Sequence, residues 1–323
     1  MSVFDDCFHT FPDFSKKPKD WETFYSREIS ALKKIPIELK SKRKVSKKLL
    51  TENSYILNYT STNKYTLQAH LVVPKKVVKK PPLVVIFPDY HQDPSIFSSL
   101  SNAGYAQLVL RLRGHEVDLL STIDTKEMSK EEIEQLSYGY FQASLSQKKS
   151  YYLKQLYLDA FRTLEIARLR SREVDTSKIG VWGKGVGASM ALFVTYFMKR
   201  TTSLFLEHPT FINLEVSQNK SKAKYSNEIN NYIKTHKREK AEIKKNLNYL
   251  DGMYFAQDLE VPTAVAVNLK SKLSIPHSSF SAFHSIIGEK EMFIHTEDKP
   301  ASLKKEKKII IEKAVDFFDR FLK

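Results

Sequence analysis

The sequence predicts an α/β protein whose central, mostly parallel sheet is covered by helices on both faces. From Pro82 onward, short and almost entirely apolar runs recur, as in strands buried on both sides. Stretches with helical spacing separate these runs, and such strand–helix alternation is typical of a parallel sheet. We expect strands at residues 83–87, 105–110, 178–183, 203–209, 263–267 and 291–295.

The first part of the chain follows a different pattern. Residues 19–33 place large apolar side chains at helical spacing, which predicts an amphipathic helix. Residues 54–60 and 65–73 then alternate apolar and polar side chains, which predicts an antiparallel hairpin. We therefore expect residues 1–75 to form a helix and hairpin extension of a single domain that spans residues 1–323.

Apolar residues at helical spacing also predict the helices between the strands. We expect them at residues 151–170, 188–198, 278–287 and 309–322. The stretch from 210 to 255 is helical in pattern but polar and rich in lysine. Because α/β sheets bind ligands at the carboxyl ends of their strands, we expect this insertion to form a cap over that edge.

Composition excludes several classes of protein. With 41% hydrophobic residues the chain can bury a sizeable core, and no run approaches the roughly 20 apolar residues of a membrane span. The N-terminus lacks the pattern of a signal peptide, so a cytoplasmic location is expected. The single cysteine, Cys7, excludes an intramolecular disulfide and a Cys-based metal site, and lacks any sign of reactivity.

The net charge of +15 comes mainly from lysine, with a concentration of basic residues from Lys33 to Lys48. One interpretation is a surface for an acidic partner or nucleic acid. The other, which we favour, is a generally solvated surface, because basic residues are spread along the chain and no recognition motif accompanies them.

The motif with most chemical meaning is the glycine turn from Gly183 to Gly187, between an expected strand and an expected helix. This is the spacing of the nucleophile elbow of α/β-hydrolases, where small residues let a tight corner close around the nucleophile. The central residue here is Gly185, which accepts a positive φ but has no side chain to attack a carbonyl.

The surrounding sequence resembles the acetyl xylan esterase/cephalosporin-C deacetylase family. The run 151–187 contains a Tyr-rich helix start, Leu-Asp-Ala, and Val-Asp-x-Ser-x-Ile-Gly-Val before the glycine turn. Further blocks follow the family in order, at residues 20–29, 81–91, 104–116, 208–214 and 244–262. The resemblance implies an α/β-hydrolase fold and a carboxylic-ester hydrolase ancestry.

The same resemblance implies that all three catalytic positions are substituted. The nucleophile position is Gly185, the acid position is Ser271 in Asn-Leu-Lys-Ser, and the base position is Pro300 in Pro-Ala. His295 lies five residues before Pro300 and does not match the base position. Because a triad works as a unit, losing every member removes nearly all catalysis.

The expectation is therefore a catalytically inactive, pseudo-esterase protein with a binding or scaffold role. In the family the oxyanion donors are backbone amides, at positions that become Tyr90 and Val186, and Arg113 is retained. We expect these three residues to bind an acetylated saccharide or small acyl ligand. The family's ring-like assemblies imply a homo-oligomer.

Other interpretations stay open. An active esterase with a non-standard nucleophile is one. Gly183, Gly185 and Ala188, with Glu207 about twenty residues on, also fit a dinucleotide-binding fingerprint. Lys184 is expected to be a solvated turn residue rather than an activated amine. No cofactor or metal is expected, since the nine histidines are scattered without a ligand motif.

Overall fold

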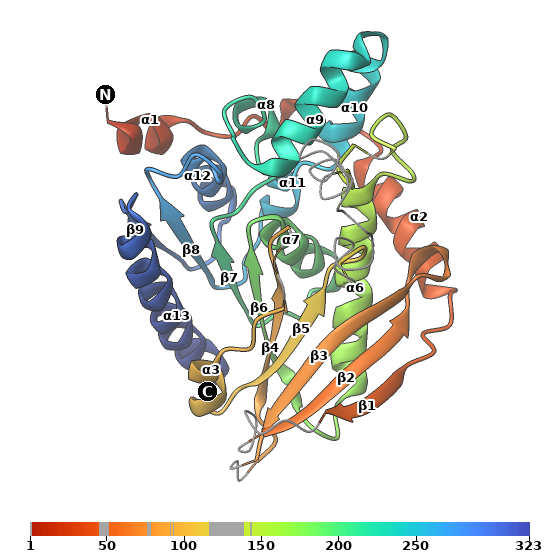
Figure 1. Ribbon diagram of the computed structural model, residues 1–323, viewed down its shortest axis with the longest axis vertical. Coiled ribbons are helices and arrows are strands. Elements are labelled where there is room, and N and C mark those ends of the chain that lie inside the picture. Colours follow the sequence, from red (N-terminus) through yellow and green to blue (C-terminus); the bar gives the residue numbers. More distant parts are fainter. Residues whose placement is uncertain are drawn as a thin grey trace, which may run out of the picture.

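The computed structural model describes residues 2–44, 52–75, 79–90, 92, 94–115, 139–142 and 144–323. Lys47, Lys48 and Glu116 lie outside these residues. The described chain forms one nine-stranded sheet in the order β1-β2-β3-β5-β4-β6-β7-β8-β9 (Figure 1). Its strands are β1 Lys40–Lys44, β2 Glu52–Thr60, β3 Thr66–Pro74, β4 Pro82–Phe87, β5 Ala106–Arg111, β6 Asp175–Lys184, β7 Ser203–Glu207, β8 Thr263–Asn268 and β9 Lys290–His295.

The sheet is mixed but mostly parallel, as the sequence predicts. Strands β1, β2, β3 and β5 pair antiparallel in turn, and every pair from β5 across to β9 is parallel. The predicted hairpin is confirmed as β2 and β3, which pair from Thr60 with Thr66 outward. Strand β1 was not expected, since its sequence KSKRK shows no apolar alternation, and it forms the outer edge of the sheet.

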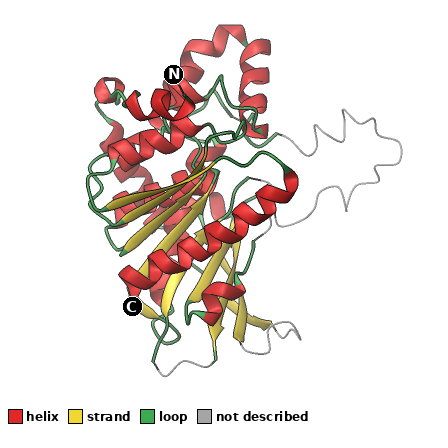
Figure 2. Cartoon of the chain, turned by 90° about the vertical axis from the view of Figure 1, so that its left-hand side faces the viewer, coloured by secondary structure: helices red, strands yellow, loops and turns green. Residues whose placement is uncertain are grey.

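Helices cover both faces, which confirms the predicted layers (Figures 1 and 2). They are α1 Val3–His9, α2 Trp21–Lys33, α3 Ser98–Asn102, α6 Tyr152–Leu169, α7 Val186–Met198, α8 Leu214–Ser217, α9 Lys224–Thr235, α10 Lys240–Tyr249, α11 Met253–Ala256, α12 Pro276–Ser285 and α13 Pro300–Leu322. The last helix begins nine residues before the apolar pattern that predicts it, because its first turns are polar.

Two cores lie on the two faces of the sheet. Alternate residues of β4 show this directly, since Val85 packs in the larger core and Val84 in the smaller one. The larger core lies under α2, α6 and α7, and the smaller one under α3 and α13. Burial on both faces is why these strands read as unbroken apolar runs.

The helical insertion after β7 is confirmed as α8–α11, drawn above the carboxyl ends of the parallel strands in Figure 1. Asp251 holds its first and last parts together. Its buried carboxylate accepts the backbone amides of Asn213, Leu214 and Met253 at 2.7–3.0 Å. Burial raises the pKa of Asp251 to about 6, although these hydrogen bonds oppose the rise.

Helix α2, the amphipathic helix of the N-terminal extension, contacts this insertion. The indole of Trp21 and the hydroxyl of Tyr25 both donate to the Tyr249 carbonyl, at 2.9 Å each. Both rings are fully buried among aromatic side chains of α7 and α11. The predicted amphipathic face of residues 19–33 therefore anchors the extension beside the insertion.

Candidate functional site

The corner between β6 and α7 has the geometry that the glycine turn predicts. Strand β6 ends at Lys184, helix α7 begins at Val186, and Gly185 between them has φ 52° and ψ −115°. This backbone conformation strains any residue with a Cβ atom, so glycine suits it. Gly187 packs so closely under Phe87 that a Cβ there would strike the Phe87 carbonyl. Glycines thus let the corner close, and Gly185, at the nucleophile position, has no side chain that could attack a carbonyl.

The carboxylate of Asp89 occupies the space above Gly185. A Cβ built on Gly185 would lie far inside van der Waals contact of the Asp89 carboxyl group. Asp89 Oδ1 accepts the backbone N–H of Tyr90 at 2.8 Å and that of Val186 at 2.9 Å. Both amides that the family resemblance assigns to the oxyanion therefore donate to one oxygen of the chain itself.

Burial raises the pKa of Asp89, while the two amide hydrogen bonds and the Lys184 ammonium act in the opposite direction. Lys184 is not a free solvated lysine, because its Nζ lies 3.1 Å from Glu207 Oε1. Glu207 Oε2 also accepts the indole N–H of Trp182 at 3.0 Å. Both Glu207 oxygens thus have partners inside the protein. This disfavours the dinucleotide interpretation, in which Glu207 would accept a hydrogen bond from a ribose hydroxyl.

A cavity of about 540 Å³ opens beside the corner. Gly185, Asp89 and Ser271 all line it, so two of the three substituted triad positions share one cavity. Pro300 is the first residue of α13, and Leu303 and Glu306, three and six residues further along the helix, also line the cavity.

A pair of ionisable side chains that the sequence did not single out lies in the same cavity. His208 follows β7 with φ 48°, and its Nε2 lies 3.3 Å from Glu306 Oε1. Glu306 is nearly fully buried, and its other oxygen accepts Asn268 Nδ2 at 2.9 Å. Burial alone would raise the pKa of Glu306. The net pKa is nevertheless below the usual value, because His208 lowers it most, followed by His295 and Asn268. Sequence reasoning missed this pair because its members are 98 residues apart with no motif joining them.

The three residues expected to bind a ligand do not form one group. Val186 contributes its amide at the corner, and Tyr90 contributes its own amide there. The Tyr90 hydroxyl instead points to the insertion, where it donates to Glu228 Oε1 at 3.1 Å.

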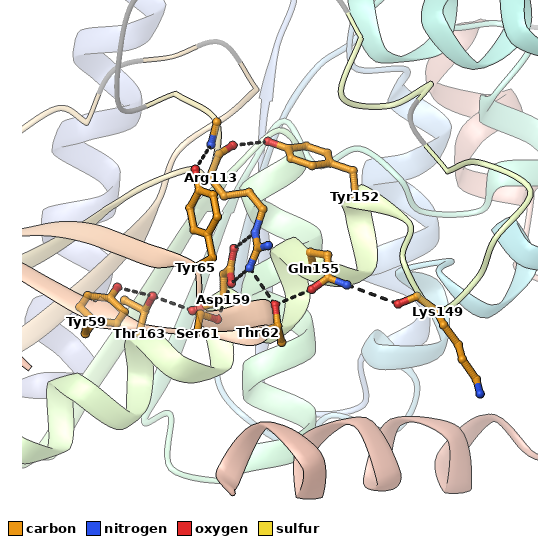
Figure 3. Close-up of polar contacts among 11 residues, drawn as sticks. Tyr59, Ser61, Thr62, Tyr65, Arg113, Lys149, Tyr152, Gln155, Asp159 and Thr163 are labelled. Atoms are coloured by element: carbon orange, nitrogen blue, oxygen red, sulfur yellow. Dashed lines mark hydrogen bonds and ion pairs between the residues drawn. The ribbon is translucent and has the colours of Figure 1, made fainter. Parts of the chain in front are cut away.

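Arg113 lies in a separate buried network (Figure 3). Its Nε and Nη2 donate to the two oxygens of Asp159 at 2.7 and 2.6 Å, and Nη2 also donates to Thr62. Ser61 donates to the same carboxylate at 2.6 Å. Arg113 is absent from the described lining of the cavity, and its guanidinium joins β5, the hairpin turn and α6.

Among the described residues no group of three or more His, Cys, Asp or Glu side chains is placed to hold a metal ion. Within the same residues no helix has both the length and the apolar character needed to cross a bilayer. Cys7 is buried, and burial raises the pKa of its thiol to about 11, which disfavours the reactive thiolate.

Comparison with known structures gives the same architecture. The acetyl xylan esterase from Paenibacillus sp. R4 matches with a TM-score of 0.78 and 21% identity, over 95% of this chain and 98% of that one. Acetyl xylan esterase 1 from Thermoanaerobacterium sp. JW/SL YS485 gives 0.72 and 17%, over 94% and 99%. The Pyrococcus horikoshii acylaminoacyl peptidase gives 0.62 and 15%, over 86% of this chain and 43% of that one.

At these identities the structures show the fold alone, the α/β-hydrolase type that the glycine corner predicts. The family follows from the sequence model of acetyl xylan esterase (AXE1), which matches residues 1–314. Because that match spans nearly the whole chain, this protein belongs to the acetyl xylan esterase family.

Proposed function

We propose that this chain is a non-hydrolytic member of its family, which binds rather than cleaves its ligand. The observation that carries the proposal is the corner at Gly185, where a side chain is lacking and the Asp89 carboxylate accepts the Tyr90 and Val186 amides. A serine at an elbow attacks a carbonyl whose oxygen these donors stabilise. Here neither the nucleophile nor the free donors are available.

The substituted acid and base positions support the same proposal. Ser271 lines the cavity but cannot hold an imidazole as a carboxylate does, and its Oγ accepts the Ser274 amide at 3.1 Å. Pro300 begins α13 and has no titratable group. The ligand we propose is an acetylated saccharide or a small acyl compound, bound in the cavity beside Gly185. We also propose that the chain is a single domain, in which the insertion at 210–255 acts as a cap.

The test is the release of acetate from acetylated xylo-oligosaccharides by the purified chain. We expect a rate equal to that of a heat-denatured sample of the same preparation. Turnover clearly above this control would contradict the proposal. A parallel assay with p-nitrophenyl acetate covers substrates too small to need the saccharide.

One observation favours a second candidate, an esterase with a rearranged site. His208 and Glu306 form a base–acid pair in the same cavity as Ser271. If Ser271 were the nucleophile and His208 its base, Ser271→Ala and His208→Ala would each abolish turnover. Activity that survives both substitutions would exclude this arrangement.

A partner-binding role through the basic stretch Lys33–Lys48 remains the scaffold version of the proposal. Its described part includes β1, where Lys40 and Lys42 lie on a strand that pairs on one side only among the described strands. Lysine on an edge strand also prevents unwanted pairing, without any partner. Heparin binding that weakens steeply with salt and with Lys42→Glu would support the partner. If heparin does not bind, or binds without dependence on salt, the lysines of β1 would serve only to prevent pairing with another strand.

We further propose a homo-oligomer in the cytoplasm. Light scattering of the purified chain is the direct measurement of its assembly, and a monomeric mass would contradict that part of the proposal.

A further inference from the structure

The two amides at the corner belong to segments far apart in the sequence. Tyr90 follows β4 and Val186 opens α7, and 97 residues separate Asp89 from Val186. Their N–H groups nevertheless point at a single oxygen, Asp89 Oδ1, at 2.8 and 2.9 Å. Two backbone donors that converge on one carboxylate oxygen form an anion site, and here the anion is supplied by the chain.

The site is strengthened by its position. Val186 is the first residue of α7, a helix of 13 residues whose dipole favours negative charge at this end. The Asp89 carboxylate lies directly over Gly185, in the space that a side chain at that position would take. Because both donors are used, a second carboxylate or carbonyl oxygen cannot approach them without displacing the first.

Charged side chains of both signs line the cavity beside the two amides. Glu207 and Glu306 line the same cavity and are largely buried. The ammonium group of Lys184 stabilises the charged form of Asp89, but it is already paired with Glu207. Lys270 is paired with Asp298 in a half-exposed position at the cavity. Lys272 and Lys307 line the cavity as well, so the like charge that an incoming carboxylate would meet at the corner is that of Asp89 itself.

We propose that Asp89 is an internal ligand of a two-amide anion site, and that removing its side chain opens this site to carboxylates and acyl oxygens. In the native chain the ligand in the cavity is then held by groups other than the Tyr90 and Val186 amides. This inference rests on the proposed function in one respect: both assume that Gly185 takes no part in catalysis.

The test is titration with sodium acetate of the ¹⁵N-labelled full-length chain, followed through the amide signals of Tyr90 and Val186. The native chain and three variants are compared. Asp89→Ala frees both amides, whereas Asp89→Asn removes the charge but keeps an acceptor oxygen at the site. Asp298→Ala removes one charge from the same cavity without touching the amides, and serves as the matched control.

We expect acetate to shift both amide signals in Asp89→Ala, with an affinity at least about tenfold above that of the native chain, since two donors become free. Asp89→Asn and Asp298→Ala should behave like the native chain. No acetate response in a folded Asp89→Ala variant would overturn the inference. A response in Asp89→Asn equal to that in Asp89→Ala would also overturn it, because repulsion rather than occupancy would then explain the native behaviour.

If Asp89→Ala does not fold, Asp89→Gly replaces it, with the same expected and contradicting results. Acetate is a product of ester cleavage and not a substrate, so its binding does not depend on turnover. Esterase activity of the native chain would end the proposed function but leave the acetate result standing. The two failures are therefore distinguishable.

Discussion

Two partly or fully buried carboxylates in this molecule are held in opposite ways. Asp159 on α6 is fully buried and faces the guanidinium of Arg113, which donates to both of its oxygens (Figure 3). Asp89 lies at the cavity, and its hydrogen bonds within the described chain come from two backbone amides. The first charge is neutralised by a hydrogen-bonded cation, and the second accepts its hydrogen bonds from peptide amides, with Lys184 as a nearby cation that is itself paired with Glu207.

The difference separates a structural carboxylate from one at a site. The Arg113–Asp159 pair joins three elements and is buried, so it is expected to serve stability. Asp89 borders open space, so solvent or a ligand can reach the two amides once its side chain is removed. Asp251 is intermediate, since it is fully buried like Asp159 but held by amides like Asp89. The three carboxylates therefore predict three different responses to mutation.

The largest effect is expected from Arg113→Ala. This change leaves the Asp159 carboxylate buried without its cation, which typically costs about 3–5 kcal/mol of unfolding free energy. Urea denaturation followed by circular dichroism measures the loss. The control is Arg168→Ala, which removes an exposed arginine from α6, the helix that carries Asp159, and should cost less than about 0.5 kcal/mol. A similarly small loss for Arg113→Ala would show that the Arg113–Asp159 pair does not stabilise the fold.

A pH-dependent effect is expected from Asp251. Its pKa rises from 3.8 in the unfolded chain to about 6 in the folded one, so the folded state binds the proton more tightly. The resulting contribution to stability is present below pH 3.8 and is lost as the pH rises through 6. The native chain should therefore gain about 2–3 kcal/mol relative to Asp251→Asn as the pH falls from about 7 to about 4. Parallel curves for the two proteins would contradict this.

The smallest effect on stability is expected from Asp89→Ala. The variant loses two hydrogen bonds but also loses the cost of a partly buried charge, and water from the cavity can reach the amides. We expect a change within about 1 kcal/mol in urea denaturation. A loss comparable to that of Arg113→Ala would show that Asp89 is a structural residue.

Much of the fold follows from the sequence because it depends on local patterns. The apolar runs, the amphipathic helix α2 and the β2–β3 hairpin each carry their own periodicity. The glycine corner is also local, since its spacing determines its backbone. Strand β1 was missed because its charged residues follow no alternation, and its pairing with β2 supplies what its sequence lacks.

The details of the site are not local, and this is why they were missed. Asp89 belongs to none of the motifs identified in the sequence, and its contact with Val186 exists only once β4 and β6 pair. Arg162 matches an i,i+3 partner for Asp159, yet it donates to Leu32 and Ile35 carbonyls while Arg113 takes Asp159. Sequence spacing alone does not show which of the two arginines pairs with Asp159.

The central claim is that no serine of this chain acts as an esterase nucleophile. Its most direct test is the intact mass of the native protein after incubation with a fluorophosphonate probe, with a heat-denatured sample alongside. The account predicts an unchanged mass in both samples, because the corner presents Gly185 beneath a carboxylate instead of an activated hydroxyl. A single adduct that forms only on the folded chain and maps to one serine would contradict it.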